Sequence, residues 1–188
     1  MSMPQSNLVA SQSVDRTTFE NLYAGLAPWD IGRPQGCVIA IAHRVTGIDF
    51  VEAAIRRARL KAAERGESVE FLVKNATALG DWGRRFASVI DFGLFHVRSD
   101  DDRQRYVEGL TRVVEPGGRL FLMCFSDAEP GAEGPRRVSR RELFETFAND
   151  WEVEAVQPVR GEINPKFTEV QFSEGGPKMW FAVVRRQG

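Results

Sequence analysis

Cysteine and histidine are scarce in this chain of 188 residues, and their scarcity excludes several classes of protein. There are two residues of each kind. Cys37 and Cys124 lie far apart and have no metal-ligand spacing, so we expect neither a disulfide framework nor a Cys/His zinc site, and no metal site is predicted. A chain with so few cysteines suits a reducing compartment, and a cytoplasmic location is the expectation.

An excess of charge of one sign and long apolar runs are also missing. The formal net charge is -1, with 25 basic and 26 acidic residues, which gives no support for a broad nucleic-acid surface. No apolar run approaches the length of a membrane span, and the opening MSMPQSNLVASQS has no apolar signal-peptide core. We therefore expect neither a nucleic-acid partner nor a membrane partner.

What is present indicates one packed domain of alternating strands and helices. Hydrophobic residues make up 43% of the chain and charged residues 27%, which is typical of a globular domain. Apolar periodicity predicts helices within 14–25, 51–66, 99–114 and 139–147, and strands near 45–49, 69–73, 88–90, 119–126, 151–159 and 178–186. Ser99 is the expected N-cap of the third helix, and Ser139 with Glu142 has the spacing of a capping box at the fourth.

This order of elements predicts the fold class and the edge of the sheet at which a ligand binds. Strands that alternate with helices favour an α/β fold with a doubly wound, mostly parallel sheet. The last two strands have no helix between them and can pair antiparallel. Ligands bind beyond the carboxyl ends of such parallel strands, so Asp49, Asn75 and the segment from Asp91 to His96 are expected along one rim.

Six phrases carry a resemblance to a known family. They are PWDIGRPQ, VTGIDF, AAIRRARLKAAERG, VIDFGLFHV, RVVEPGGRLFLMCFSD and GPRRVSRREL, in that order. In these phrases the chain resembles the class I S-adenosylmethionine-dependent methyltransferases, in particular the small-molecule branch that includes thiopurine and halide or thiol methyltransferases. The resemblance implies a Rossmann-like fold in a single domain over 1–188, with 1–35 as an arm over the cofactor site and 36–188 as the core.

The resemblance also implies a cofactor, a reaction and a partner. The cofactor is S-adenosyl-L-methionine, and the reaction is methyl transfer to an oxygen, sulfur or nitrogen nucleophile of a small molecule. The protein is expected to act as a monomer or homodimer. Two other functions stay open: a non-catalytic methyltransferase-like domain that has lost cofactor binding, and a dinucleotide-binding oxidoreductase, because a strand-end acid also binds the ribose of NAD.

Several residues match cofactor-binding positions of the family. Asp49 matches the acid that accepts hydrogen bonds from the ribose hydroxyls, although the same carboxylate can cap the helix that follows. Asn75 and Ala76 match the pair beside the adenine, where an ordinary turn is the alternative. The aromatic ring of Trp29 suits a sulfonium or an adenine face. The complete expected cofactor set is Trp29, Asp49, Phe50, Asn75, Ala76, Asp91 and Gly93.

The loop from Asp91 to His96 is expected beneath the methionine part of the cofactor and beside the substrate. His96 is the only histidine there and is the candidate catalytic base for an attacking hydroxyl or thiol. The alternative is a histidine that packs and hydrogen-bonds the backbone. The expected substrate contacts are Arg33, Phe92, Phe95 and Arg136.

One part of the family pattern is missing between Gln35 and Val45. The resemblance calls there for a strand, a glycine-rich turn and a helix, whose N-terminus favours the cofactor's carboxylate. About nine residues cannot hold them, since a strand alone needs about five. Either a segment has been left out of the sequence, or the protein lacks its main cofactor loop. We favour the first, because losing a central strand exposes a buried sheet, and we expect a chain break within 35–44.

Overall fold

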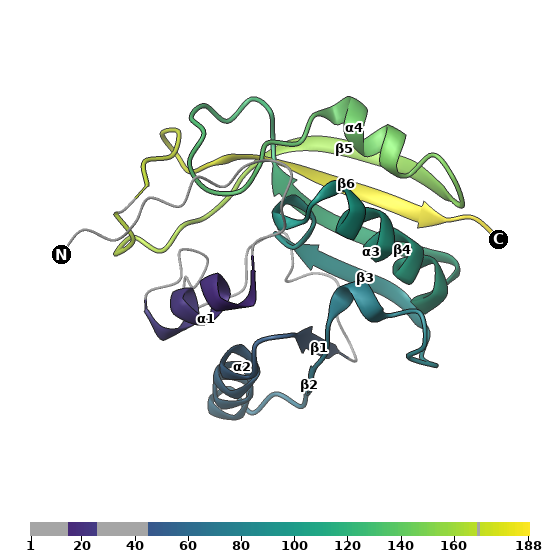
Figure 1. The fold of residues 1–188 in the computed structure, drawn as a ribbon, viewed down its shortest axis with the longest axis horizontal. Coiled ribbons are helices and arrows are strands. Elements are labelled where there is room, and N and C mark those ends of the chain that lie inside the picture. The colour runs from purple at the N-terminus through teal and green to yellow at the C-terminus, as the bar shows by residue number, and fades with distance from the viewer. Residues whose placement is uncertain (1–14, 26–44, 169) are drawn as a thin grey trace.

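A computed structural model describes residues 15–25, 45–168 and 170–188 of the chain (Figure 1). The strands are β1 (Thr46–Asp49), β2 (Glu70–Val73), β3 (Phe86–Phe92), β4 (Val114–Phe125), β5 (Trp151–Arg160) and β6 (Lys178–Arg186). The helices are α1 (Arg16–Ala24), α2 (Glu52–Glu64), α3 (Asp100–Val113) and α4 (Arg140–Thr146), with short 3-10 turns η1 (Ala76–Ala78) and η2 (Phe95–Val97). The alternation predicted from the sequence is therefore present.

The strands form two separate sheets. β1 and β2 make a parallel pair, and the other four strands pair in the order β3-β4-β6-β5. β3 and β4 are parallel, whereas β6 runs antiparallel to both β4 and β5. The predicted α/β class, with parallel strands and an antiparallel C-terminal pair, is confirmed.

Local signals set the helix boundaries as expected. The hydroxyl of Ser99 accepts a hydrogen bond from the amide of Asp102 at 3.2 Å and begins α3. The hydroxyl of Ser139 accepts one from the amide of Glu142 at 3.1 Å and begins α4. Each cap satisfies a backbone donor that the first helical turn leaves unpaired, so both predicted helix starts are confirmed.

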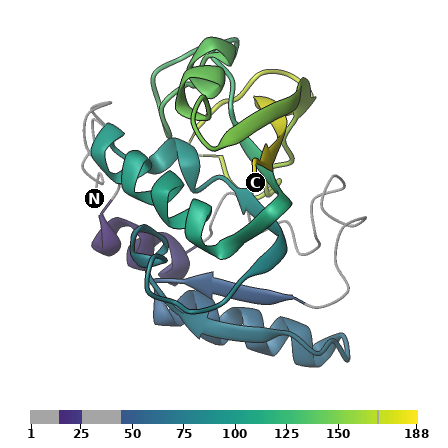
Figure 2. The ribbon, with the colours of Figure 1, turned by 90° about the vertical axis from the view of Figure 1, so that its right-hand side faces the viewer.

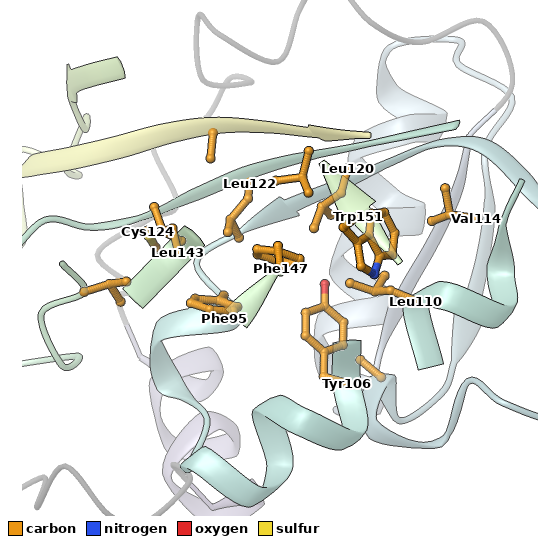
Figure 3. Packing of buried hydrophobic residues seen from close by; sticks show 14 of the residues in the cluster. Phe95, Tyr106, Leu110, Val114, Leu120, Leu122, Cys124, Leu143, Phe147 and Trp151 are labelled. Carbon is orange, nitrogen blue, oxygen red and sulfur yellow. The ribbon is translucent and has the colours of Figure 1, made fainter. Parts of the chain in front are cut away.

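The main hydrophobic core lies between one face of the four-stranded sheet and helices α3 and α4 (Figure 3). Leu110 of α3 and Leu143 of α4 are fully buried against Leu120 and Leu122 of β4. Burying each such side chain contributes roughly 1.5–3 kcal/mol. This core holds β4 and its neighbours in place, and with them the loops at their carboxyl ends.

The opposite face of the same sheet is less completely covered. Phe121 of β4 and Phe181 of β6 stack there with ring centroids 6.4 Å apart, and Ile90, the register partner of Phe121, is 37% exposed. The small buried cluster on this face, Met123, Phe125 and Met179, includes no residue of a described helix. A doubly wound sheet normally has helices on both faces.

An open seam separates the two sheets. Within the described residues, β1 pairs only with β2 and β3 pairs only with β4, and no strand lies between β1 and β3. Figures 1 and 2 show the β1–β2 pair with α2 beyond the β3 side of the larger sheet. Ile48 of β1 nevertheless packs against the main core. We refer to the space between the facing edges of β1 and β3 as the seam.

Two sequence predictions need comment. β4 begins at Val114 rather than near Arg119, because Val114 already pairs with Phe86 of β3. The EPGG stretch then bulges out of the ladder, with Gly117 at φ 77°, and the register shifts between Phe86 and Ser88. The predicted chain break within 35–44 lies outside the described residues and stays a prediction.

None of the helices in the described part of the chain is both long enough and apolar enough to cross a membrane.

Candidate cofactor and acceptor site

Asp49 ends β1 at the carboxyl rim of the sheet. Its Oδ1 accepts the amide of Val51 at 2.8 Å, and its Oδ2 accepts the hydroxyl of Tyr23 in α1 at 3.0 Å. Each carboxylate oxygen keeps a second lone pair. The side chain is half-buried. Asp49 therefore contacts the start of α2 and still has lone pairs that can accept hydrogen bonds from a ribose diol.

Phe50, the next residue, lies between α1 and a buried arginine. Its ring meets Phe19 edge-on at 5.6 Å, and the guanidinium of Arg98 lies 5.8 Å from its centroid. Arg98 is only 7% exposed, and its Nε has no hydrogen-bond partner. Burial lowers the pKa of Arg98, while Asp102, Tyr106, Asp91 and Asp49 act in the opposite direction. The acids on both sides of the seam therefore favour the charged form of Arg98.

Asn75 and Ala76 follow β2 and open η1. The Oδ1 of Asn75 accepts both the amide and the hydroxyl of Thr77 at 3.0 Å, so the turn that the sequence offered as an alternative is present. Asn75 is exposed and Ala76 is buried. The amide oxygen of Asn75 already has two donors, which leaves its NH₂ group as the side chain's means of contacting an adenine.

Asp91 is the buried carboxylate of the rim. It is 3% exposed, and its two oxygens accept the amide of Leu94 at 2.7 Å and the hydroxyl of Tyr106 at 3.0 Å. Burial raises the pKa of Asp91 to about 6, against the opposing effect of these hydrogen bonds. Gly93 follows at φ 87°, a conformation that glycine adopts without strain, and its amide donates to the carbonyl of Met123 at 3.0 Å.

His96 lies below this loop and is 5% exposed. Its Nδ1 accepts the amide of Phe125 at 2.8 Å, and its ring meets the Phe125 ring edge-on at 4.9 Å. Burial, together with the charges of Arg137 and Arg136, lowers the pKa of His96 to about 3. The ring therefore stays neutral at physiological pH and has the packed, backbone-bonded geometry that the sequence left as an alternative.

The expected substrate contacts are placed very differently from one another. Phe92 is half-buried at the end of β3 and packs against the cluster of Met123, Phe125 and Met179. Phe95 has no exposed surface and stacks on Phe147 at 6.0 Å in the main core (Figure 3). As folded it offers no surface to a substrate.

Arg136 is bound within the protein, and the two arm residues are not described. The guanidinium of Arg136 donates to Oε1 of Glu142 in α4 at 2.5 and 2.6 Å, and the same oxygen accepts from Arg103 at 2.5 Å. The carboxylate of Glu142 therefore offsets part of the positive charge of Arg136. Trp29 and Arg33 lie outside the described residues, so their predicted contacts stay predictions.

Four residues of the site were not singled out from the sequence. Tyr23 and Tyr106 bind the two rim carboxylates, Arg98 is a buried cation over the ring of Phe50, and Glu129 is a buried carboxylate in the loop after β4. Glu129 accepts the amides of Ser173 at 2.9 Å and Lys178 at 2.8 Å. A charged residue inside the apolar phrase GLFHVRS was the available signal for Arg98; the partners of the other three are too distant in sequence to infer.

Solved structures share this fold. One from work on the "Conversion of a Disulfide Bond into a Thioacetal Group during Echinomycin Biosynthesis" superposes with a TM-score of 0.76 at 26% identity, over 91% of this chain and 92% of that one. The 1,6-didemethyltoxoflavin-N1-methyltransferase of Burkholderia thailandensis, solved with S-adenosylhomocysteine, gives a TM-score of 0.60 at 22% identity over 98% of this chain and 80% of its own. The second likeness concerns the fold alone.

Sequence comparison decides the family. The profile of the family described as "Methyltransferase domain" matches residues 35–118. The 2-heptyl-1-hydroxyquinolin-4(1H)-one methyltransferase of Mycobacteroides abscessus is 30% identical over 180 positions, which cover 76% of this chain and 79% of the relative. This chain belongs to the class I S-adenosylmethionine-dependent methyltransferases. Its cofactor is S-adenosylmethionine, and its enzyme class is methyltransferase rather than dinucleotide oxidoreductase.

The same alignment contains positions that this methyltransferase lacks. The alignment runs over 180 positions. Only 76% of the 188 residues of this chain take part in it, which is far fewer than 180. The relative therefore has a substantial number of positions without a counterpart in this chain.

The described residues fit the adenosine half of the cofactor better than its amino-acid half. Asp49 keeps lone pairs for a diol, and Asn75 and Ala76 follow the neighbouring strand β2 at the same rim. Among the described helices, none of those that begin at this rim follows a glycine-rich turn that could bind a carboxylate. Arg98, with an unpaired buried donor, is the described cation nearest to that role.

Proposed function

We propose that the protein transfers a methyl group from S-adenosylmethionine to an oxygen, sulfur or nitrogen atom of a small molecule bound beyond the carboxyl ends of β3 and β4. The observation that carries this proposal is the placement of Arg98. The buried guanidinium of Arg98 lies 5.8 Å from the ring centroid of Phe50, which directly follows Asp49 at the end of β1. Arg98 itself ends the loop that follows Asp91 and β3, so one cation joins the ends of both strands in a methyltransferase chain.

Each rim residue has a proposed part in binding the cofactor. Asp49 would accept the ribose hydroxyls, with Phe50 beside the adenosine and Asn75 and Ala76 at the adenine edge. Asp91 would hold the loop after β3 in shape, since both its oxygens bind the protein, and Gly93 would allow close approach of the ligand. In the arm, Trp29 would cover the cofactor and Arg33 would contact the substrate.

The cofactor supplies a methyl group already activated on a sulfonium. The chain's own task is therefore mostly to hold the acceptor in line and to exclude water, and proximity with orientation can supply much of the rate enhancement. Half-buried Phe92 lies at the carboxyl end of β3, supported from behind by the buried cluster of Met123, Phe125 and Met179, so it offers an apolar wall there. Such a wall suits an aromatic or alkyl acceptor, as the resemblance to the thiopurine branch also suggests.

We also propose that a strand, a turn and a helix belong between Gln35 and Val45 of a single domain over 1–188, in which 1–35 is the arm. That strand would pair with the open edges of β1 and β3, and the helix would pack on the exposed face that bears Ile90 and Phe121. A parallel neighbour needs a crossover of a dozen or more residues, and only about nine lie between Gln35 and Val45. The additional positions of the Mycobacteroides abscessus relative support the same conclusion.

Calorimetric titration with S-adenosylhomocysteine tests the cofactor proposal. The chain in its present form is compared with a chimaera that carries the relative's residues at the junction between Gln35 and Val45. We expect the chimaera to bind at least tenfold more tightly, because its new turn and helix terminus add hydrogen bonds to the ligand's carboxylate. If neither protein binds, the chain is a non-catalytic domain of the family and the proposed activity is refuted.

A screen with radiolabelled cofactor tests the acceptor. The first probe is 2-heptyl-1-hydroxyquinolin-4(1H)-one, the compound in the relative's name, followed by heteroaromatic thiols and amines of similar size. Methyl transfer to one of these and to no nucleic acid would support a small-molecule acceptor. Failure of every probe, in a protein that binds the cofactor, would contradict the proposed aromatic acceptor.

A further inference from the structure

The two ring nitrogens of His96 are in different situations. Nδ1 accepts the amide of Phe125 at 2.8 Å. Nε2 makes no hydrogen bond to any described residue, and the residue as a whole keeps 5% of its surface exposed. One nitrogen is therefore fixed to the backbone, and the other has no partner within the described part of the chain.

The fixed nitrogen determines where the ring proton lies. A neutral imidazole has one N–H and one lone-pair nitrogen. Because Nδ1 accepts a backbone N–H, its lone pair is occupied and the proton is on Nε2. Neither nitrogen then has a lone pair free to take a proton from a substrate, which removes the usual route for a general base.

Nε2–H points toward the rim loop. A Cβ built on Gly93 would be 3.4 Å from Nε2 and 3.8 Å from Cε1, so the absent side chain of Gly93 leaves the ring edge uncovered on that side. Gly93 is bonded to β4 through Met123, which fixes the distance between loop and ring. The donor therefore lies beside the end of β3, where the acceptor is proposed to bind.

Two arginines influence the charge state of the ring. The positive charges of Arg137 and Arg136 disfavour the imidazolium form of His96, and the same charges favour an anion next to Nε2. Arg137 lies 5.2 Å from the Phe125 ring centroid, and its guanidinium donates to the backbone carbonyls of Glu129, Pro130, Glu133 and Pro135. Arg136 is bound to Glu142, so Arg137 is the stronger contributor.

We infer that His96 is a positioning residue that donates a hydrogen bond from Nε2 to an oxygen or nitrogen of the methyl acceptor. The acceptor is accordingly one whose nucleophile is already electron-rich without a protein base, such as the anion of an acidic aromatic hydroxyl or thiol. This inference rests on the proposed function, and it replaces deprotonation by His96 with orientation by His96.

Histidine-labelled NMR tests the state of the ring without any substrate. The chain has two histidines, so His43→Gln leaves one signal and assigns it. We expect ¹⁵N shifts of an Nε2–H tautomer that do not titrate between about pH 5 and pH 8, whereas an unperturbed histidine titrates near 6.5. A Nδ1–H tautomer, or a titration near neutrality, would overturn the inference.

Two substitutions separate the nitrogens in the methyl-transfer assay. Gln places its amide near Nε2 and keeps a donor there, whereas Asn places its oxygen near Nδ1 and keeps the acceptor for Phe125. We expect His96→Asn to lower turnover by roughly tenfold to a hundredfold, the effect of losing a hydrogen bond to a charged group. His96→Gln should lose only a few-fold, although it should be the less stable of the two on heating.

The results distinguish this inference from the proposed function. If the unsubstituted protein methylates an acceptor and the Asn variant is as active as the Gln variant, the donor role is refuted and the proposed function stands. A pH-rate profile with a limb near 6.5 that disappears in His96→Gln would restore the general base and refute the donor. If the unsubstituted protein methylates nothing, the proposed function fails and the inference fails with it, whatever the NMR result.

Discussion

The hydroxyl of Tyr106 in α3 donates a 3.0 Å hydrogen bond to Oδ2 of Asp91 at the end of β3. The tyrosine is 3% exposed and so is the aspartate, so a helix of the main core binds the rim loop through a buried polar pair. Burial, with the neighbouring Asp91, raises the pKa of Tyr106 well above its usual value. The phenol therefore remains protonated, and a donor, at neutral pH.

Tyr106→Phe should destabilise the protein more at alkaline pH than at acid pH. The raised pKa of Asp91, about 6 against 3.8 for the free group, means that the carboxyl ionises above pH 6 and then depends most on the lost donor. We expect a loss of about 2–3 kcal/mol at pH 8 and about 1 kcal/mol at pH 5, measured by urea denaturation. An equal loss at both pH values would contradict an ionised Asp91.

Asp91→Asn is the matched variant. Its stability relative to the unsubstituted protein should rise with pH, whereas that of Tyr106→Phe should fall. Because the folded pKa of Asp91 is raised to about 6, its contribution to stability is fully present below the unfolded pKa and is lost as pH rises through 6. Relative to the unsubstituted protein, Asp91→Asn should therefore gain on the order of 2 kcal/mol between pH 4 and pH 7. His96 contributes the reverse trend, but equally to both proteins.

Asp49→Ala should weaken cofactor binding in whichever form of the protein binds S-adenosylhomocysteine. Loss of a charged acceptor costs roughly 1.5–3 kcal/mol, which is about tenfold to more than a hundredfold in affinity. The variant also loses its contact to the Val51 amide, so some stability is lost with it. Tyr23→Phe is the control, because it removes the other partner of Asp49 and leaves the carboxylate. Equal affinity in Asp49→Ala and the control would refute the ribose contact.

Glu129→Gln should loosen the segment that precedes β6. Although burial works to raise the pKa of Glu129, the amides of Lys178 and Ser173 lower it overall, so its stabilising effect is present above the unfolded pKa and is lost in acid. A glutamine can accept with only one oxygen and turns its NH₂ toward a backbone donor. We expect a loss of about 1–3 kcal/mol and faster proteolysis near Ser173. Glu133→Gln, at an exposed position, should change neither.

Hydrogen exchange should show weaker amide protection in β1 and β2 than in the centre of the larger sheet. β4 and β6 are paired on both sides, whereas β1 and β3 each have one open edge within the described residues. Amides of β4 and β6 are expected to exchange by global unfolding, and those of β1 and β2 much sooner, as a unit that opens locally. In the chimaera with the inserted segment, β1 should gain protection. Equal protection of β1 and β4 in the present chain would argue against an open seam.

The sequence alone determined the elements and their order, because these depend on local signals. The caps at Ser99 and Ser139 are contacts within one turn, and alternating apolar runs mark strands wherever one face is buried. The mismatch between Gln35 and Val45 was also visible in the sequence, since a count of residues needs no coordinates. Asp49 was found at the rim because a strand-end acid has a position that topology fixes.

The tertiary structure alone decided which polar groups are bound and which are accessible. No local rule tells that Phe95 packs fully in the core while Phe92 stays at the rim, or that Tyr106 binds Asp91 from 15 residues away. The proton position on His96 follows from the amide of Phe125, which is 29 residues further along the chain. Hydrogen bonds and burial between distant segments depend on how the sheet packs against its helices, and that packing is a property of the whole chain.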